Sequence, residues 1–127
     1  RRIAVARGRV VTTVDAAGAL SADTVVQARV AGADAAKRAW DLIPLCHPIR
    51  LVDIDVTIEP EGSEVAIEAT TEVFAPTGVE MEALTACSIA GLVLVGALRH
   101  RDPDAMLTGV GLWRKDGGRS GTWIRPD

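Results

Sequence analysis

The sequence predicts an α+β fold in which an antiparallel sheet and two helices alternate in the order strand, helix, strand, strand, helix, strand. Segments 51–59 and 64–74 show the alternation of paired strands, and segments 24–42 and 77–99 show helical spacing. With 127 residues the chain has the length of one domain, and we expect residues 1–127 to form it. Because 48% of the residues are hydrophobic and only 3% are aromatic, the core must be aliphatic.

The first predicted elements are a strand and a helix. Residues 5–13 are rich in Val and Thr and alternate loosely, which favours an edge strand. After a connector at 15–19, Asp23 stands before apolar residues at helical spacing and is a good N-cap. Because Pro44 disfavours helical backbone at the residue before it, we expect this helix to cover 24–42.

A loop at 43–48 leads to the predicted hairpin. Residues 51–59 alternate apolar and polar side chains throughout, as a half-buried strand does. Residues 60–63 supply turn-forming residues, and 64–74 return as the antiparallel partner.

The second helix is predicted to open with a capping box, because Thr77 and Glu80 have the Ser/Thr-x-x-Glu spacing. It is expected to continue to about Arg99. The helix is apolar nearly all round, and a helix of that kind is covered on more than one side. Since the sheet covers only one side, we expect a homo-oligomer larger than a dimer.

A strand at 107–114, a loop at 115–121 and a short strand at 122–124 complete the chain. The order of elements is that of the split βαβ arrangement in ferredoxin-like α+β folds.

Composition excludes several functions. A net charge of −3 and the scarcity of aromatic residues argue against a nucleic-acid partner. The longest nearly uncharged run, 83–98, is shorter than the roughly 20 residues of a membrane span, so no membrane segment is expected. No apolar signal segment precedes Arg1, which favours a cytoplasmic location. Cys46 and Cys87 lack metal-type spacing, and no metal or other cofactor is expected.

Two polar groups of residues are candidates for chemistry. His47 follows Cys46 in an apolar loop, where it could donate a proton or contact a phosphate, or simply cap and pack. Glu80 and Glu82 flank Met81 at a helix start. They could face a cleft for binding or acid–base work, or they could serve only the helix terminus.

Basic residues form the other candidates. The chain has only two lysines, Lys37 and Lys115. The loop 115–121 could offer backbone N–H groups, Lys115 and Arg119 to a phosphate, or could be an ordinary hairpin turn. Lys37 and Arg38 could likewise be a solvated pair on a helix surface.

Three sequence segments, taken together, indicate a protein family more specifically than any of these residues does alone. They are Leu-Ile-Pro-Leu-Cys-His-Pro at 42–48, Thr-Gly-Val-Glu-Met-Glu-Ala-Leu-Thr-Ala at 77–86 and Lys-x-Gly-Gly-x-Ser-Gly at 115–121. In this order and spacing they resemble the cyclic pyranopterin monophosphate synthase (MoaC) family of molybdenum cofactor biosynthesis. Segments 28–32 and 35–38 match as well, so the resemblance spans essentially the whole chain.

The resemblance implies a ferredoxin-like fold and a hexamer, a trimer of dimers with active sites at the dimer interface. It also implies conversion of 3′,8-cyclo-7,8-dihydroguanosine triphosphate to cyclic pyranopterin monophosphate with release of pyrophosphate. Lys115 matches an active-site lysine of the family, and Lys37 a basic residue near the phosphates. The implied substrate contacts are Leu45, Cys46, His47, Glu80, Met81 and Glu82.

The sequence departs from the family at catalytic positions. The family carries a catalytic Asp-x-x-Lys on the second helix, where this chain has Gly96 and Arg99, and a lysine where this chain has Ser21. Arg99 keeps a positive charge but does not deprotonate, so it can bind phosphate and cannot act as a base. Two hypotheses follow. One is an active synthase, and the other is a catalytically degenerate paralogue that acts as a nucleotide-binding or hetero-oligomeric structural subunit.

Overall fold

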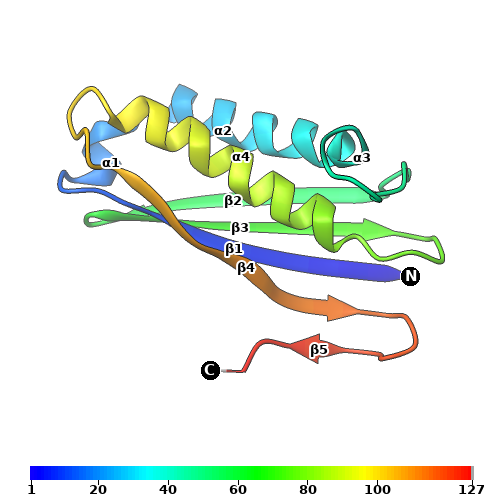
Figure 1. Cartoon of the computed structure of the whole chain (residues 1–127). Helices are drawn as coiled ribbons and strands as arrows, with labels where there is room; N and C mark the ends of the chain where they lie inside the picture. Colours follow the sequence, from blue (N-terminus) through cyan, green and yellow to red (C-terminus); the bar gives the residue numbers. More distant parts are fainter. Residues whose placement is uncertain (127) are drawn as a thin grey trace.

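The computed structural model describes residues 1–126. Figure 1 shows its helices and strands in chain order. They are β1 (Arg2–Val11), α1 (Ala16–Ala19), α2 (Ala22–Lys37), α3 (Ala39–Leu42), β2 (Asp53–Glu61), β3 (Glu64–Val73), α4 (Glu80–Leu98), β4 (Met106–Asp116) and β5 (Trp123–Ile124).

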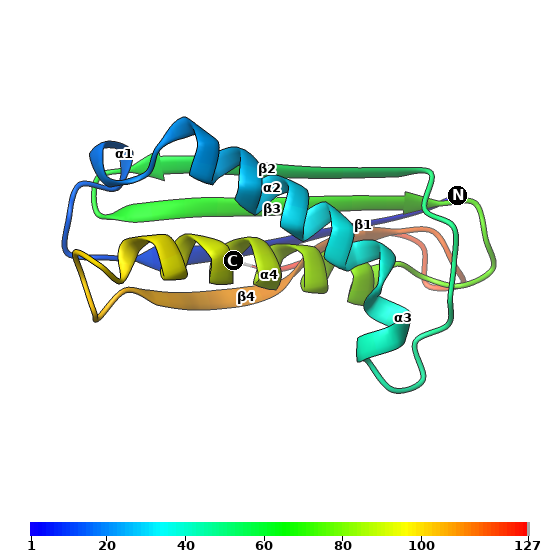
Figure 2. The same ribbon diagram turned by 90° about the horizontal axis from the view of Figure 1, so that it is seen from above.

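The strands form one antiparallel sheet in the order β2-β3-β1-β4-β5. Helices α2 and α4 lie side by side on one face of this sheet (Figures 1 and 2). The first four strands and these two helices have the order and arrangement of a ferredoxin-like fold, so the predicted α+β class is confirmed. The short strand β5 extends the sheet beyond β4.

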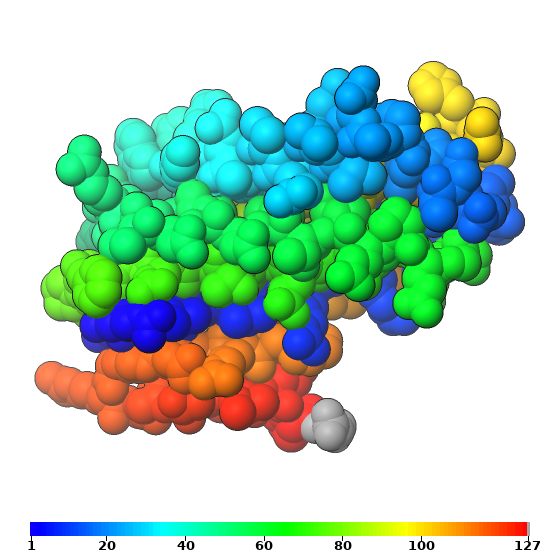
Figure 3. Space-filling model, turned by 180° about the vertical axis from the view of Figure 1, so that it is seen from behind, coloured from blue at the N-terminus to red at the C-terminus, as the bar shows by residue number. Residues whose placement is uncertain are grey.

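The core lies between the helices and the sheet. Strand β1 buries Ala4, Ala6 and Val10 under the helices and exposes Arg7 and Arg9 on the opposite face. No helix among residues 1–126 covers that second face (Figure 1). Seen from behind, the surface shows the helix layer above the exposed strands (Figure 3).

Small residues let the two long helices approach closely. Gly32 of α2 lies so near α4 that a β-carbon there would stand 2.7 Å from the Ala86 carbonyl oxygen and 3.2 Å from the Ala90 Cβ. The run of alanines in both helices is therefore a packing feature, because bulkier side chains would separate the helix axes.

The predicted helix 24–42 is wrong in both its start and its continuity. Helix α2 begins two residues earlier, because the Ser21 hydroxyl, and not Asp23, accepts the N-cap hydrogen bond from the Thr24 N–H at 3.1 Å. The helix is interrupted at Arg38, where φ is −113° and ψ is 9°, and resumes as α3. The interruption leaves Trp40 half exposed, whereas a straight helix would set it on the face of buried Ala36.

The predicted capping box is also wrong. Helix α4 begins at Glu80 with Val79 as its N-cap, and no side chain caps it. The Glu80 carboxylate folds back over Gly78, where it leaves no room for a β-carbon. Buried Thr71 fixes this helix start instead, since its hydroxyl donates to the Val79 carbonyl oxygen at 3.0 Å.

Helix α4 is apolar enough, and long enough, to cross a membrane by composition alone, but it lies here as a core helix. The sheet covers one side of it and α2 covers another, so the expectation that only the sheet covers it was incomplete (Figure 2). Leu92 still exposes 56% of its surface on the remaining side.

Candidate functional site

The loop between α3 and β2 carries the first candidate residues. Leu45 has φ of +66°, the only positive φ at a non-glycine residue among residues 1–126, and it is 97% exposed. A leucine in this left-handed conformation stores backbone strain, and such strain concentrates at ligand-binding loops. The Cys46 N–H donates to the Ile43 carbonyl oxygen at 3.2 Å, which closes the turn just before His47.

A thiol and a buried carboxyl meet between this loop and α4. The Cys46 thiol donates to Oε2 of Glu82 at 3.5 Å, and Glu82 is only 4% exposed. Burial is the main cause that raises the pKa of Glu82 above its ordinary value, and burial likewise raises the pKa of the Cys46 thiol. Each group therefore releases its proton at a higher pH than its exposed counterpart, and a buried carboxyl such as Glu82 is suited to exchanging a proton.

The second cysteine is no candidate nucleophile. Cys87 belongs to α4 and is buried in the core, and burial raises its pKa to about 11. It therefore stays a thiol at neutral pH.

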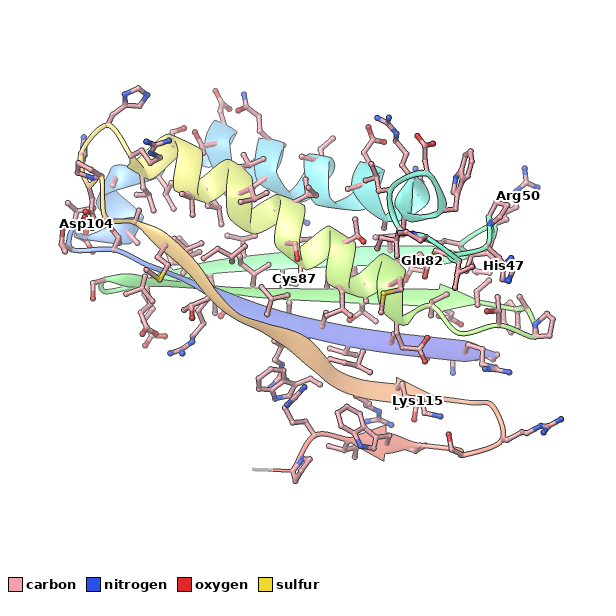
Figure 4. The ribbon with its side chains drawn as sticks, viewed as in Figure 1. His47, Arg50, Glu82, Cys87, Asp104 and Lys115 are labelled. Carbon is pink, nitrogen blue, oxygen red and sulfur yellow. The ribbon has the colours of Figure 1, made fainter. Side chains whose placement is uncertain are left out.

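Lys115 lies near the end of β4, on the face of the sheet that the helices cover, since it pairs with buried Ala4. Its ammonium donates to the Gly117 carbonyl oxygen at 3.1 Å and contacts the Ser120 hydroxyl oxygen. An ammonium has three donors, so one remains for a ligand. Figure 4 shows His47, Glu82 and Lys115 at the same end of the molecule.

The remaining substrate-contact candidates lie at this end too. Glu80 and Met81 open α4 beside Glu82, and Met81 is 40% exposed. Lys37 ends α2 and lines a hollow of about 560 Å³ together with Arg50. The sequence analysis did not predict Arg50 as a site residue, because a lone arginine after the loop between Pro44 and Pro48 forms no recognisable motif.

Gly96 and Arg99 do not join this group. They lie at the opposite end of α4, about 21 Å along the helix axis from Glu82 to Gly96 at 1.5 Å per residue. Ser21, at the start of α2, lies at that far end as well (Figure 2). All three departures from the family pattern therefore fall at one end of the molecule, and the matching motifs fall at the other.

Gly96 faces open space. A β-carbon at this position would meet nothing within 4 Å, and both Gly96 and Arg99 are exposed. Neither residue is constrained by packing within the chain. Among residues 1–126, no cluster of three or more His, Cys, Asp or Glu residues is placed to hold a metal ion.

The topology and these side chains define an α+β protein of the ferredoxin-like class that gathers a thiol, carboxyls and an ammonium at one end. Residues 1–118 match the MoaC family. The chain therefore belongs to the MoaC family.

Relatives match over nearly the whole chain. Cyclic pyranopterin monophosphate synthase 2 of Mycobacterium tuberculosis (strain ATCC 25618 / H37Rv) is 43% identical, over 98% of this chain and 78% of its own length. The cyclic pyranopterin monophosphate synthase of Thermomicrobium roseum is 45% identical, over 99% and 81%. A solved structure of a de novo designed protein with a ferredoxin fold is similar at a TM-score of 0.48 and 15% identity, over 87% of this chain and 83% of its own.

Proposed function

We propose that this protein acts in molybdenum cofactor biosynthesis and binds a pterin or guanosine triphosphate-type substrate at the end that carries Cys46, Glu82 and Lys115. Family membership supports the pathway. The observation that carries the site is the convergence of three motifs, far apart in sequence, at one end of the sheet (Figure 4). We also propose that residues 1–127 form one domain that assembles as a homo-oligomer, a hexamer, in the cytoplasm.

The chemistry of this end suits such a substrate. A triphosphate needs cations, and Lys115, Lys37 and Arg50 supply them in a chain whose net charge is −3. Glu82 has the raised pKa that a proton-transferring carboxyl needs. His47 lies next to Cys46 in the same loop and is available as a further donor.

The first candidate activity is the synthase reaction, which converts 3′,8-cyclo-7,8-dihydroguanosine triphosphate to cyclic pyranopterin monophosphate and pyrophosphate. Lys115 is the retained family catalytic residue in this proposal. Arg99 lies at the opposite end of its own chain, so it would contribute its fixed positive charge to the site of a neighbouring chain in the oligomer. Gly96 contributes no side chain. Proton transfer would then depend on Glu82 and Lys115.

The second candidate is a catalytically degenerate paralogue that binds nucleotide as a subunit of a larger assembly. It is favoured because Ser21, Gly96 and Arg99 stand where the family pattern has a lysine, an aspartate and a lysine. Gly96 and Arg99 also lie about 21 Å or more from Glu82 along α4. In this proposal one chain keeps the nucleotide-binding residues at the end that carries Lys115. It lacks the proton-transferring aspartate and lysines of the family at the opposite end. A second, complete chain in the assembly could supply them.

Calorimetry with GTP tests the site. Lys115→Ala is expected to weaken binding by about 10- to 100-fold, the worth of one charge-assisted hydrogen bond. Arg114→Ala is the matched control, because it removes the same charge from the next residue, whose guanidinium is bound to Asp116. Equal affinity of wild type and Lys115→Ala would remove Lys115 from the site.

Turnover of the cyclic dihydroguanosine triphosphate by the purified protein separates the two candidates. A rate of roughly 1 s⁻¹ or faster, typical of enzymes, supports the synthase. Binding without turnover supports the degenerate paralogue.

A further inference from the structure

Two loops carry the candidate site, and neither has regular secondary structure. Residues 74–79 lead from β3 into the start of α4, and residues 117–122 follow Lys115 between β4 and β5. The relative position of Glu82 and Lys115 depends on how these two loops are held. One side chain is seen to contact both of them.

That side chain is Arg2. Arg2 is the first residue of β1 and pairs with Val73, the last residue of β3. The first loop begins directly after Val73. Nη2 of Arg2 donates to the Pro76 carbonyl oxygen at 2.9 Å. This hydrogen bond fixes the first loop four residues before α4 begins.

The same guanidinium packs on the second loop. Gly117 and Gly118 both have positive φ, +96° and +81°. A β-carbon at Gly118 would lie 2.8 Å from Nη1 of Arg2, and one at Gly117 would lie 2.9 Å from its Cδ. The glycines are required here both for their backbone conformation and for the close approach of Arg2.

Arg2 differs from Arg1 before it and from the other arginines of its strand. Arg1, Arg7 and Arg9 each form an ion pair with a glutamate of β3. Arg2 instead gives its hydrogen bond to a backbone carbonyl oxygen of a loop. A planar guanidinium with five donors can bond one loop while it lies flat against another, which a lysine ammonium cannot do.

We propose that Arg2 is a positioning residue that holds the Lys115 loop against the loop that opens α4, and so sets where Lys115 stands relative to Glu82. The proposal deepens the proposed function, because it concerns the same substrate-binding end. Arg2 acts through the two loops and is not assigned a contact with the substrate.

Hydrogen exchange tests the positioning without any ligand. In Arg2→Met, amide exchange is expected to become faster in both 77–79 and 117–121. Arg7→Met is the matched control, since it removes an arginine from the same strand that pairs with Glu68 and touches neither loop. Unchanged exchange in either loop of Arg2→Met, or the same change in Arg7→Met, would overturn the proposal.

The two lysines give a second readout. Protein labelled only at lysine side chains shows one signal from Lys115 and one from Lys37. In Arg2→Met the Lys115 signal is expected to move, while the Lys37 signal stays in place. Movement of both signals would indicate general unfolding and would contradict a positioning role.

Binding then connects the positioning to function. GTP affinity is expected to fall about tenfold in Arg2→Met, with partial rescue in Arg2→Lys, which can still donate to Pro76. Undiminished affinity in Arg2→Met would overturn the proposal. If Lys115→Ala also leaves affinity unchanged while the exchange result holds, the proposed function fails and the loop contact stands.

Discussion

Asp102 is a nearly buried carboxylate, 3% exposed, that ties the end of β1 to the turn after α4. Its Oδ2 accepts from the Thr12 hydroxyl and from the Thr13 N–H, each at 2.7 Å, and its Oδ1 accepts from the Asp104 N–H at 2.9 Å. The Thr12 hydrogen bond is the first cause that holds the pKa of Asp102 below its ordinary value, and the Thr13 N–H is the next.

This carboxylate gives stability a defined pH dependence. Because the folded pKa lies below the unfolded one, the stabilisation is present above pH about 4 and is lost as the pH falls through the folded pKa. Asp102→Asn is expected to lower stability at pH 7 and to flatten its dependence on pH below about 4. Urea denaturation at pH 7, 4 and 3 measures both effects, and parallel curves for the two proteins would contradict the assignment.

Gly96 and Arg99 lie three residues apart on α4, so a paired Asp and Lys at these positions would share a face. The open space at Gly96 accepts an aspartate without a clash. If turnover of the wild type is very low, Gly96→Asp with Arg99→Lys is expected to raise it. Each general acid–base group contributes typically about 10²–10⁴-fold.

Single-turnover assays of the cyclic dihydroguanosine triphosphate measure this gain, with Gly96→Ala as the control that fills the position without a carboxylate. Ser21→Lys is the third change if the gain is small. No gain in any combination, with assembly intact, would show that these positions are not what limits the reaction.

At the residue scale, the motifs predict candidate site residues but not the contacts between them. Cys46 and Glu82 fall in separate motifs, and their hydrogen bond joins positions 36 residues apart that only the fold brings together. Arg2 carried no signal, because one arginine among several at the start of a strand has no pattern. Its two loop contacts exist only in three dimensions.

Among the elements, the strands lie where their patterns predicted them and the helix ends do not. The prediction that residues 5–13 form an edge strand is wrong, because β1 pairs with β3 on one side and with β4 on the other, at the centre of the sheet. Side-chain alternation identifies a strand and does not show how many neighbours it has. The alternation at 51–59 and 64–74 predicted β2 and β3, and pairing in the sheet confirms it. Helix ends depend on competing local contacts, and the N-cap of α2 is therefore Ser21 and not Asp23. The four-residue helix α1 lies in the segment predicted as a connector, because it is too short to show helical spacing. The break at Arg38 lies inside continuous helical spacing, which carries no information on a kink.

Two glycines in helices are expected to respond oppositely to the same substitution. Gly32→Ala is expected to destabilise the protein by about 1–3 kcal/mol, because its β-carbon would meet the Ala86 carbonyl oxygen on the neighbouring helix. Gly96→Ala is expected to stabilise it by up to about 1 kcal/mol, since alanine is the better helix former and the site is open. Urea denaturation of both variants checks the signs, and equal shifts would show that helix spacing is not set at Gly32.

On the scale of the whole molecule, the helices cover one face of the sheet and leave apolar surface outside the core. Val26 and Val30 on α2 and Leu92 on α4 are 53%, 60% and 56% exposed. Val26 and Val30 line a groove beside Ile54 and Val56 of β2. Exposed apolar surface of this kind marks places where protein chains meet. The sequence-based expectation of an oligomer therefore stays a prediction, now with a candidate surface.

Light scattering at micromolar concentration is expected to give a mass more than twice the 13.4 kDa of one chain. Leu92→Glu is expected to lower that mass, because it places a charge on the exposed apolar side of α4. Glu61→Gln, a polar change in an exposed strand end, is the control. A mass near 13.4 kDa for the wild type would refute the oligomer.

Helix α4 spans about 28 Å from Glu80 to Leu98, and this length has an evolutionary consequence. Substitutions at exposed positions of its far end, such as Gly96 with its open space, leave the Cys46–Glu82 pair and the Lys115 loop where they are. Selection can therefore act on the two ends separately. A substitution at an exposed position of one end can therefore change the chemistry available there and leave the fold and the contacts of the other end intact.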